Sequence, residues 1–132
     1  MKTMPIWIQE MTVLKIHDAQ LAEHGGSTGI RDQGLLDSAL HHPINLFSYG
    51  SPNLFELAAA YAERIAKNHP FIDGNKRTAY VVMLLFLRLN GFDLIAPREE
   101  RVIKMVELAS SKITVEQFVN WLKENTKLIP KK

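Results

Sequence analysis

The chain has 132 residues, a formal net charge of +2 and no cysteine. This length predicts one domain over residues 1–132, and the missing cysteines exclude thiolate catalysis and thiolate zinc sites. The charge is too mild to indicate nucleic-acid binding. The start of the sequence lacks the apolar core of a signal peptide, and the longest apolar run, AYVVMLLFL, is too short to span a bilayer. We therefore expect a cytoplasmic protein without membrane contact.

Helical patterns dominate the first half of the chain. Apolar residues at helical spacing predict a helix from about Gln9 to Glu23, and RDQGLLDSALHHP predicts a second that stops before Pro43. A third is expected in SPNLFELAAAYAERIAKN, with Ser51 as its N-cap and Pro52 at its first position. The connection between the second and third, INLFSYGS, is expected to form either a small hairpin or flap or an ordinary loop.

The second half predicts three more helices. One runs from about Asn75 to Asn90 and stops at Gly91, and its long apolar stretch indicates a helix buried on all sides. Another runs from about Pro97 to Ser110, and TVEQFVNWLKEN begins with a capping box. The sequence therefore predicts an all-α bundle of about six helices around a buried central helix.

A cluster of polar residues stands at the start of that apolar helix. The first N–H groups of a helix have no intrahelical partner and the helix dipole is positive there, which favours an anion. Gly74 permits a positive φ and a close approach of a ligand to the backbone. Lys76 and Arg77 are unfavourable against the dipole unless they bind an anion such as a polyphosphate.

Two further residues complete a possible site for phosphate transfer. Asp73 can bind Mg²⁺, which takes one or two protein carboxylates together with phosphate oxygens. His69 can accept a proton near neutral pH. Purely structural roles remain open: a loop histidine, an N-cap at Asp73 or Asn75, and a solvated pair of cations.

The segment HPFIDGNKRTA resembles the signature of the Fic/Doc superfamily, H-P-F-x-[D/E]-G-N-G-R-x-x-R. Lys76 replaces the second signature glycine and Tyr80 replaces the last arginine, and the N-K-R-T-A form is similar to that of the death-on-curing (Doc) toxins. GIRDQGLLDSAL, residues 29–40, also resembles the N-terminal region of those toxins. The resemblance covers nearly the whole chain and implies the Fic/Doc fold. The matching residues are His69, Pro70, Phe71, Asp73, Gly74, Asn75 and Arg77.

The resemblance implies a role for each matching position. His69 would deprotonate a target hydroxyl and Asp73 would bind Mg²⁺. The nucleotide, ATP, would be bound by Phe71, Gly74, Asn75, Lys76 and Arg77, with Lys76 and Arg77 also serving catalysis. The segment Phe47 to Gly50 would be the flap that docks the target.

The family contains two reactions. Fic enzymes transfer AMP from ATP, whereas Doc transfers the terminal phosphate to a threonine of elongation factor Tu and stops translation. A lysine at position 76 fills the room that a glycine leaves for further phosphates, which favours phosphate transfer. If the protein is an enzyme, AMP transfer remains the alternative reaction. If it is not an enzyme, the alternative is a catalytically silent module that sequesters nucleotide or a partner protein. Weak nucleic-acid binding is the last alternative.

The resemblance also implies a protein partner. Many Fic enzymes restrain themselves with an [S/T]-x-x-x-E-[G/N] helix whose glutamate pairs with the last signature arginine. In this chain the candidate glutamate, Glu124, has Asn120 where Ser or Thr is required, and the arginine is Tyr80. We therefore expect a separate antitoxin of the Phd type, small and folding on binding.

Overall fold

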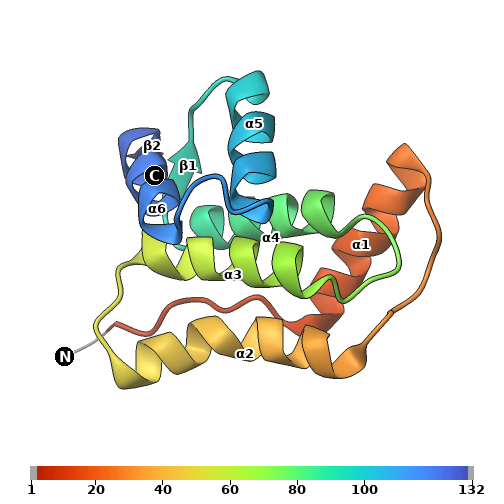
Figure 1. Cartoon of the computed structure of the whole chain (residues 1–132). Helices are drawn as coiled ribbons and strands as arrows, with labels where there is room; N and C mark the ends of the chain where they lie inside the picture. Colours follow the sequence, from red (N-terminus) through yellow and green to blue (C-terminus); the bar gives the residue numbers. More distant parts are fainter. Residues whose placement is uncertain (1–2, 131–132) are drawn as a thin grey trace.

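The computed structural model describes residues 3–130, and helices make up most of that part of the chain. The elements are α1 (Glu10–His24), α2 (Gln33–Tyr49), α3 (Leu54–Asn68), α4 (Asn75–Leu89), β1 (Phe92–Leu94), α5 (Arg98–Ala109), α6 (Val115–Glu124) and β2 (Thr126–Leu128). Figure 1 shows α3 between α2 and α4, with α1 packed on α4, and with α5 and α6 on the side away from α2. The predicted all-α architecture is confirmed.

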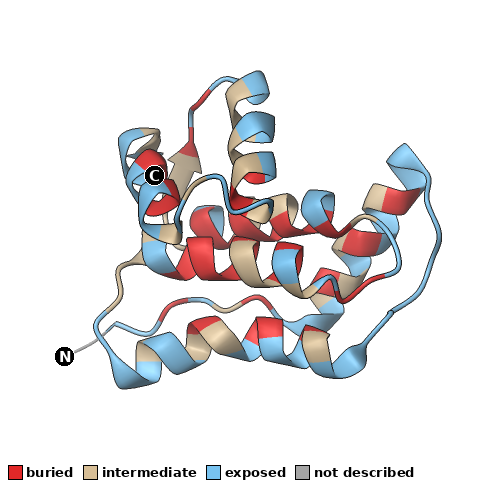
Figure 2. Cartoon of the chain, in the orientation of Figure 1, coloured by how far each residue is buried: buried red, intermediate tan, exposed pale blue. Residues whose placement is uncertain are grey.

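The core of the bundle is the interface between α3 and α4, where the buried residues concentrate in Figure 2. The buried face of α3 includes five alanines, whose short side chains let neighbouring helices approach closely. From α4 the larger side chains of Val82, Met83 and Phe86 fill the space, and each is fully buried. Burial of these side chains supplies the main favourable contribution to folding.

The central helix is less completely buried than its composition predicts. Tyr80, Val81, Leu84 and Leu85 of α4 are only half-buried, and Leu89 is 43% exposed. The short helices and strand on that side cover α4 only in part, so burial on all sides was too strong a prediction. Among the residues that the structure describes, no helix is long and apolar enough to cross a bilayer.

The start of α3 differs from the predicted one. Asn53, not Ser51, is the N-cap: its Oδ1 accepts from the N–H of Glu56 at 2.8 Å, and the Glu56 carboxylate accepts from the N–H of Asn53 at 3.0 Å. This reciprocal pair satisfies two N–H groups. Ser51 could not form it, because the residue three positions later is Leu54, whose side chain accepts no hydrogen bond.

The helix α2 continues through Pro43 to Tyr49, so the predicted stop before Pro43 and the flap at Phe47 to Gly50 were wrong. Leu36, Leu40 and Pro43 are buried on the same face of α2, which packs on α3. This continuous apolar contact compensates for the hydrogen bond that proline removes. The segment assigned to a flap is therefore mostly helical.

The remaining element ends agree with the sequence. Gly91 has φ 96° just after α4, and Thr114 and Gln117 form the predicted capping box at α6. The small antiparallel sheet, with Phe92 opposite Leu128, was not predicted. Strands of three residues are too short to show a two-residue periodicity.

Candidate active site

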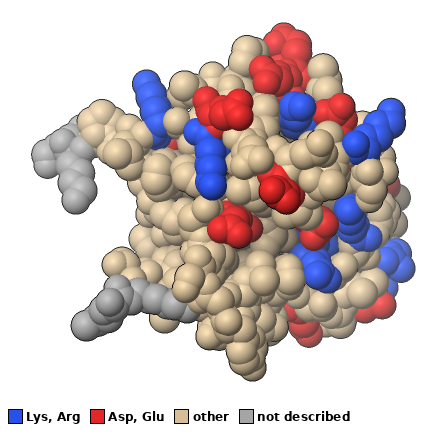
Figure 3. Space-filling model, turned by 60° about the vertical axis from the view of Figure 1, so that its left-hand side comes forward, with Lys and Arg blue, Asp and Glu red and all other residues tan. Residues whose placement is uncertain are grey.

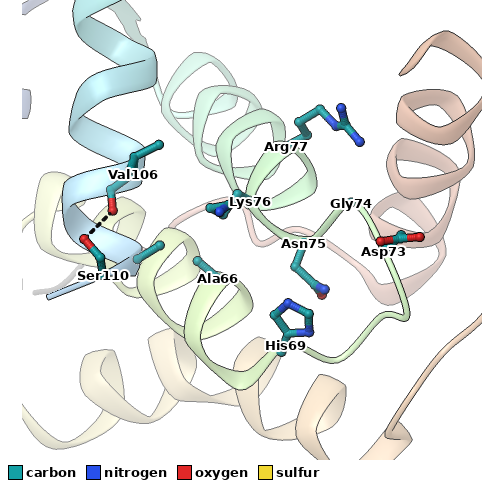
Figure 4. Close-up of a pocket in the computed structure, with 10 residues that line it drawn as sticks. Ala66, His69, Asp73, Gly74, Asn75, Lys76, Arg77, Val106 and Ser110 are labelled. Atoms are coloured by element: carbon teal, nitrogen blue, oxygen red, sulfur yellow. Dashed lines mark hydrogen bonds between the residues drawn. The ribbon is translucent and has the colours of Figure 1, made fainter. Parts of the chain in front are cut away.

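A cavity of about 570 Å³ opens at the N-terminus of α4, between the C-terminal ends of α3 and α5 (Figure 4). It collects six of the seven residues that the sequence marks as candidates, which come from the end of α3, the following loop and the first turn of α4. The lining residues are Ala66, His69, Asp73, Gly74, Asn75, Lys76, Arg77, Val106, Ala109 and Ser110.

The first turn of α4 faces this cavity without a side-chain cap. Gly74 is the N-cap, has φ 77°, and offers no side-chain oxygen to the helix. This left-handed conformation is the one that the sequence predicts for Gly74, and it brings bare backbone to the cavity. The N–H groups of Asn75, Lys76 and Arg77 have no intrahelical acceptor by their position. The helix end can therefore bind an anion.

Lys76 and Arg77 bring two positive charges to the same helix end, and both are exposed. Within residues 3–130 the ion pairs involve other side chains, so no acidic residue neutralises either of these two. In Figure 4, Lys76 extends toward α5, while Arg77 leaves α4 in another direction. An anion in the cavity would be bound by both the helix end and these charges.

His69 is fixed by its backbone, and its ring is left exposed. It is the C-cap of α3 with φ 54°, a strained value for a residue other than glycine. Arg31 stabilises this turn from a distant part of the chain, since its Nε donates to the carbonyl of His69 at 2.7 Å and its Nη2 to that of Asn68 at 2.9 Å. The ring points toward Asn75 in Figure 4 and makes no hydrogen bond with the described residues. It is thus available to a substrate.

Asp73 is exposed at the cavity wall and is oriented from two sides. Its Oδ2 accepts a hydrogen bond from the N–H of Ser27 at 2.9 Å. Its main-chain oxygen accepts from Nε2 of His17 at 2.8 Å. The other carboxylate oxygen has no partner among the described residues, so the carboxylate can still bind a cation.

Phe71 and the side chain of Asn75 form the framework under the site. Phe71 is fully buried and does not line the cavity, which corrects its predicted role as a nucleotide contact. The Asn75 amide is bound to Phe71 at both ends, accepting from its N–H and donating to its carbonyl, each at 2.9 Å. What Asn75 presents to an anion is therefore its own backbone N–H.

Two supporting residues escaped the sequence analysis. His17 is 3% exposed, and its ring stacks on Phe71 with centroids 3.8 Å apart and an angle of 11°. Arg31 belongs to the segment between α1 and α2, where the N–H of Arg31 bonds to Pro70 at 2.7 Å and the carbonyl of Gly29 accepts from Ile72 at 3.1 Å. The similarity of residues 29–40 to the Doc toxins was the only signal that could have drawn attention to this segment.

The charge distribution gives no support to nucleic-acid binding on the face drawn in Figure 3. Basic and acidic side chains alternate over that face without a continuous basic patch. The formal net charge is only +2. A nucleic-acid site requires clustered basic residues along one face.

An uncapped helix end, a loop histidine, a loop carboxylate and two unpaired cations around one cavity define a helical protein with a site suited to phosphate chemistry. The profile of the Fic/DOC family matches residues 7–87, more than half of the chain. The chain belongs to the Fic/DOC family.

Two curated relatives share this region. The chain is 44% identical over 75 residues to Toxin Doc of Mycolicibacterium smegmatis, a match that covers 54% of this chain and 57% of that protein. It is 38% identical over 80 residues to Protein kinase doc of Escherichia phage P1, covering 60% of this chain and 64% of that one. Each match thus spans less than two thirds of the relative.

A solved structure has the same fold. It is the N-terminal Fic domain of a VirB-translocated Bep effector protein of Bartonella quintana with bound ADP, and the TM-score is 0.50 at 19% identity. The similarity covers 73% of this chain and 47% of that one. At this identity the likeness supports the fold alone.

Proposed function

We propose that this protein is the toxin of a toxin–antitoxin pair and acts in the cytoplasm as an ATP-dependent phosphotransferase on a protein hydroxyl group. The observation that carries the proposal is the uncapped first turn of α4, which opens into a cavity that also contains His69, Asp73 and two unpaired cations. The names of the two curated relatives, Toxin Doc and Protein kinase doc, support the same reading. The target we favour is a translation factor such as elongation factor Tu.

Each side chain has a role in the proposed reaction. The terminal phosphate of ATP lies against the N–H groups of the first turn of α4, where Lys76 and Arg77 stabilise its negative charge. His69 accepts the proton of the target hydroxyl as the hydroxyl oxygen forms its bond to the terminal phosphorus. The bond from that phosphorus to the bridging oxygen breaks, and ADP leaves.

Mg²⁺ fits this site. Mg²⁺ is commonly bound by one or two carboxylates together with substrate phosphates, and Asp73 supplies one exposed carboxylate beside the anion site. Within residues 3–130 no cluster of three His, Asp or Glu residues could bind a metal by itself, which agrees with a metal that needs the nucleotide as a ligand. When bound there, Mg²⁺ would neutralise phosphate charge in the transition state.

Lys76 favours transfer of the terminal phosphate over transfer of AMP. Its side chain lines the cavity and extends toward α5, where a glycine would leave space. In AMP transfer, two further phosphates must fit beyond the transferred α-phosphate, and the lysine reduces the room for them. The terminal phosphate, with none beyond it, is therefore the one that binds at the first turn of α4. AMP transfer is the alternative reaction, and the fate of labelled phosphates separates the two.

An antitoxin is the expected protein partner. The chain lacks the glutamate–arginine pair by which many Fic enzymes restrain themselves. Tyr80 stands in place of the arginine, and its side chain carries no positive charge. Here the Tyr80 hydroxyl accepts instead from Nη1 of Arg101 at 3.2 Å. We propose a small antitoxin of the Phd type that folds over the site. Failure of the chain to form a complex with the product of the neighbouring reading frame would argue against it.

Mass spectrometry of a cell extract treated with purified protein, Mg²⁺ and ATP tests the proposal. We expect one phosphorylated Ser, Thr or Tyr on a translation factor, and no such product with His69→Ala. An AMP adduct at the same residue would support the alternative reaction. If the His69→Ala variant inhibits growth as strongly as wild type, the protein is a catalytically silent binding module and the proposal of an enzyme is wrong.

A further inference from the structure

The exposed segment between α1 and α2 runs beside the loop that carries Asp73. The carbonyl of Gly29 accepts a hydrogen bond from the N–H of Ile72 at 3.1 Å, and the N–H of Ser27 donates to Oδ2 of Asp73 at 2.9 Å. In the second contact, a backbone donor binds the side chain that we propose as the metal ligand. The orientation of that carboxylate therefore depends on where this segment places Ser27.

Gly26 allows the close approach of the two segments. A Cβ at position 26 would lie 3.3 Å from the Cβ of Asp73 and 3.0 Å from Cδ2 of Leu21, and both distances are shorter than ordinary van der Waals contacts. Leu21 is only 8% exposed, so its side chain has little room to move away. A side chain at position 26 would therefore push the segment away from Asp73 and lengthen the hydrogen bond from Ser27.

The hydrogen bond from Ser27 fixes Asp73 and leaves one of its carboxylate oxygens for a ligand. Oδ2 is bound to Ser27, and Oδ1 has no partner among residues 3–130. Because Asp73 is exposed, its side chain would otherwise exchange among rotamers, and binding a cation would cost the entropy of fixing one of them. A hydrogen bond that orients a metal-binding carboxylate in advance typically changes the metal affinity by about 10–100-fold.

We infer that the turn at Gly26 and Ser27 positions the Asp73 carboxylate for Mg²⁺, an inference that rests on the proposed use of Mg²⁺ and ATP. Gly26 keeps the turn within hydrogen-bonding distance of Asp73, and the Ser27 N–H selects an orientation in which Oδ1 stays free. Neither residue lines the active-site cavity, so both act through Asp73. Their effect should therefore be confined to nucleotide binding that involves the metal.

Gly25 and Gly26 provide a matched pair of variants for the test. Both are exposed and have a positive φ, 80° and 124°, so an alanine is strained at each position. A Cβ at Gly25 would meet open space, whereas one at Gly26 would meet Asp73. Calorimetric titration with ATP, once with saturating Mg²⁺ and once with EDTA, measures the contribution of the metal to the ATP affinity of each variant.

We expect wild type to bind ATP more tightly with Mg²⁺ than with EDTA, because without the metal the Asp73 carboxylate repels the phosphates. Gly26→Ala should weaken ATP binding by about tenfold or more with Mg²⁺ and leave it unchanged with EDTA, while Gly25→Ala changes neither affinity. In an Asp73→Asn background, which lacks the metal-binding charge, Gly26→Ala should have no further effect.

Equal effects of Gly25→Ala and Gly26→Ala would overturn the positioning role, as would a loss in Gly26→Ala that is the same with Mg²⁺ and with EDTA. An undiminished effect of Gly26→Ala in the Asp73→Asn background would also overturn it. A wild type that binds ATP equally tightly in both conditions would refute the proposed metal site, and the positioning role with it. Absence of ATP binding in wild type would refute the proposed function itself.

Discussion

His17 donates a hydrogen bond from Nε2 to the main-chain oxygen of Asp73 at 2.8 Å, while its ring lies flat on Phe71. Because Asp73 precedes Gly74 and the first turn of α4, this contact positions the loop that carries both the proposed metal ligand and the anion site. A buried residue of α1 thus orients a site more than fifty positions later in the chain.

His17→Phe keeps an aromatic ring against Phe71 and removes the donor. We expect the free energy of unfolding to fall by about 1–3 kcal/mol, since the Asp73 carbonyl loses its partner. Phosphate transfer should also fall, by about tenfold or more, because the loop loses its fixed position. Urea denaturation and a transfer assay measure the two effects, with the exposed His24→Phe on the same helix as control. Loss of stability without loss of transfer would show that the loop does not depend on His17.

Gly74 and Gly91 allow backbone strain to be separated from function. Their φ angles are 77° and 96°, and an added Cβ would meet only ordinary contacts at Gly74 and open space at Gly91. Alanine should therefore lower the free energy of unfolding by a similar amount at both positions, about 1–2 kcal/mol. Only Gly74→Ala should weaken ATP binding, because relief of the positive φ at the N-cap would move the backbone that carries the first N–H groups of α4, whereas Gly91 lies beyond the other end of the helix. Equal ATP affinity in the two variants would contradict the anion site at this helix end.

Arg31→Lys tests the connection between the α1–α2 segment and His69. Lysine keeps the charge but cannot bond at once to the carbonyls of Asn68 and His69, as the guanidinium does at 2.9 and 2.7 Å. We expect kcat to fall about tenfold with little change in ATP affinity, since His69 is misplaced and the phosphate site is not. Steady-state kinetics and calorimetry measure both, and the exposed Arg98→Lys is the control. A variant with normal kcat would show that His69 needs no such support.

The buried hydroxyl of Tyr61 should make the protein less stable at alkaline pH. Burial raises the pKa of its hydroxyl above the usual 10.0, with a smaller opposing effect from the hydrogen bond that it accepts from the Ile8 N–H at 3.1 Å. Because the folded state binds this proton more tightly than the unfolded state, the stabilisation is complete below about pH 10 and is lost as pH rises through the folded pKa. Urea denaturation at about pH 8 and pH 11 should show a larger loss for wild type than for Tyr61→Phe. Equal losses would refute the assignment.

The sequence predicts most of this architecture because helical periodicity and end signals are local. The capping box at Thr114, the stop at Gly91 and the conformation of Gly74 all follow from single residues and their neighbours. The continuation of α2 through Pro43 does not, because a tertiary contact with α3 outweighs the local preference of proline.

The candidate site likewise contains residues that the sequence predicts and residues that only the fold brings to it. The signature places His69, Asp73 and the first turn of α4 within nine residues, so their gathering around one cavity is local. His17 and Arg31 reach the site only through the fold, and neither lies in a pattern of its own. The burial of Phe71 likewise depends on the His17 ring above it, which no spacing in the sequence indicates.

The central claim is that the first turn of α4 binds the terminal phosphate of ATP for transfer to a protein hydroxyl by His69. The most direct measurement incubates the purified protein and Mg²⁺ with a cell extract and ATP labelled on either the terminal or the α-phosphate. We predict that only the terminal label enters protein, and that His69→Ala lowers its entry by about 10²–10⁴-fold. Entry of the α-label, or of the terminal label at the same rate with His69→Ala, would contradict the account.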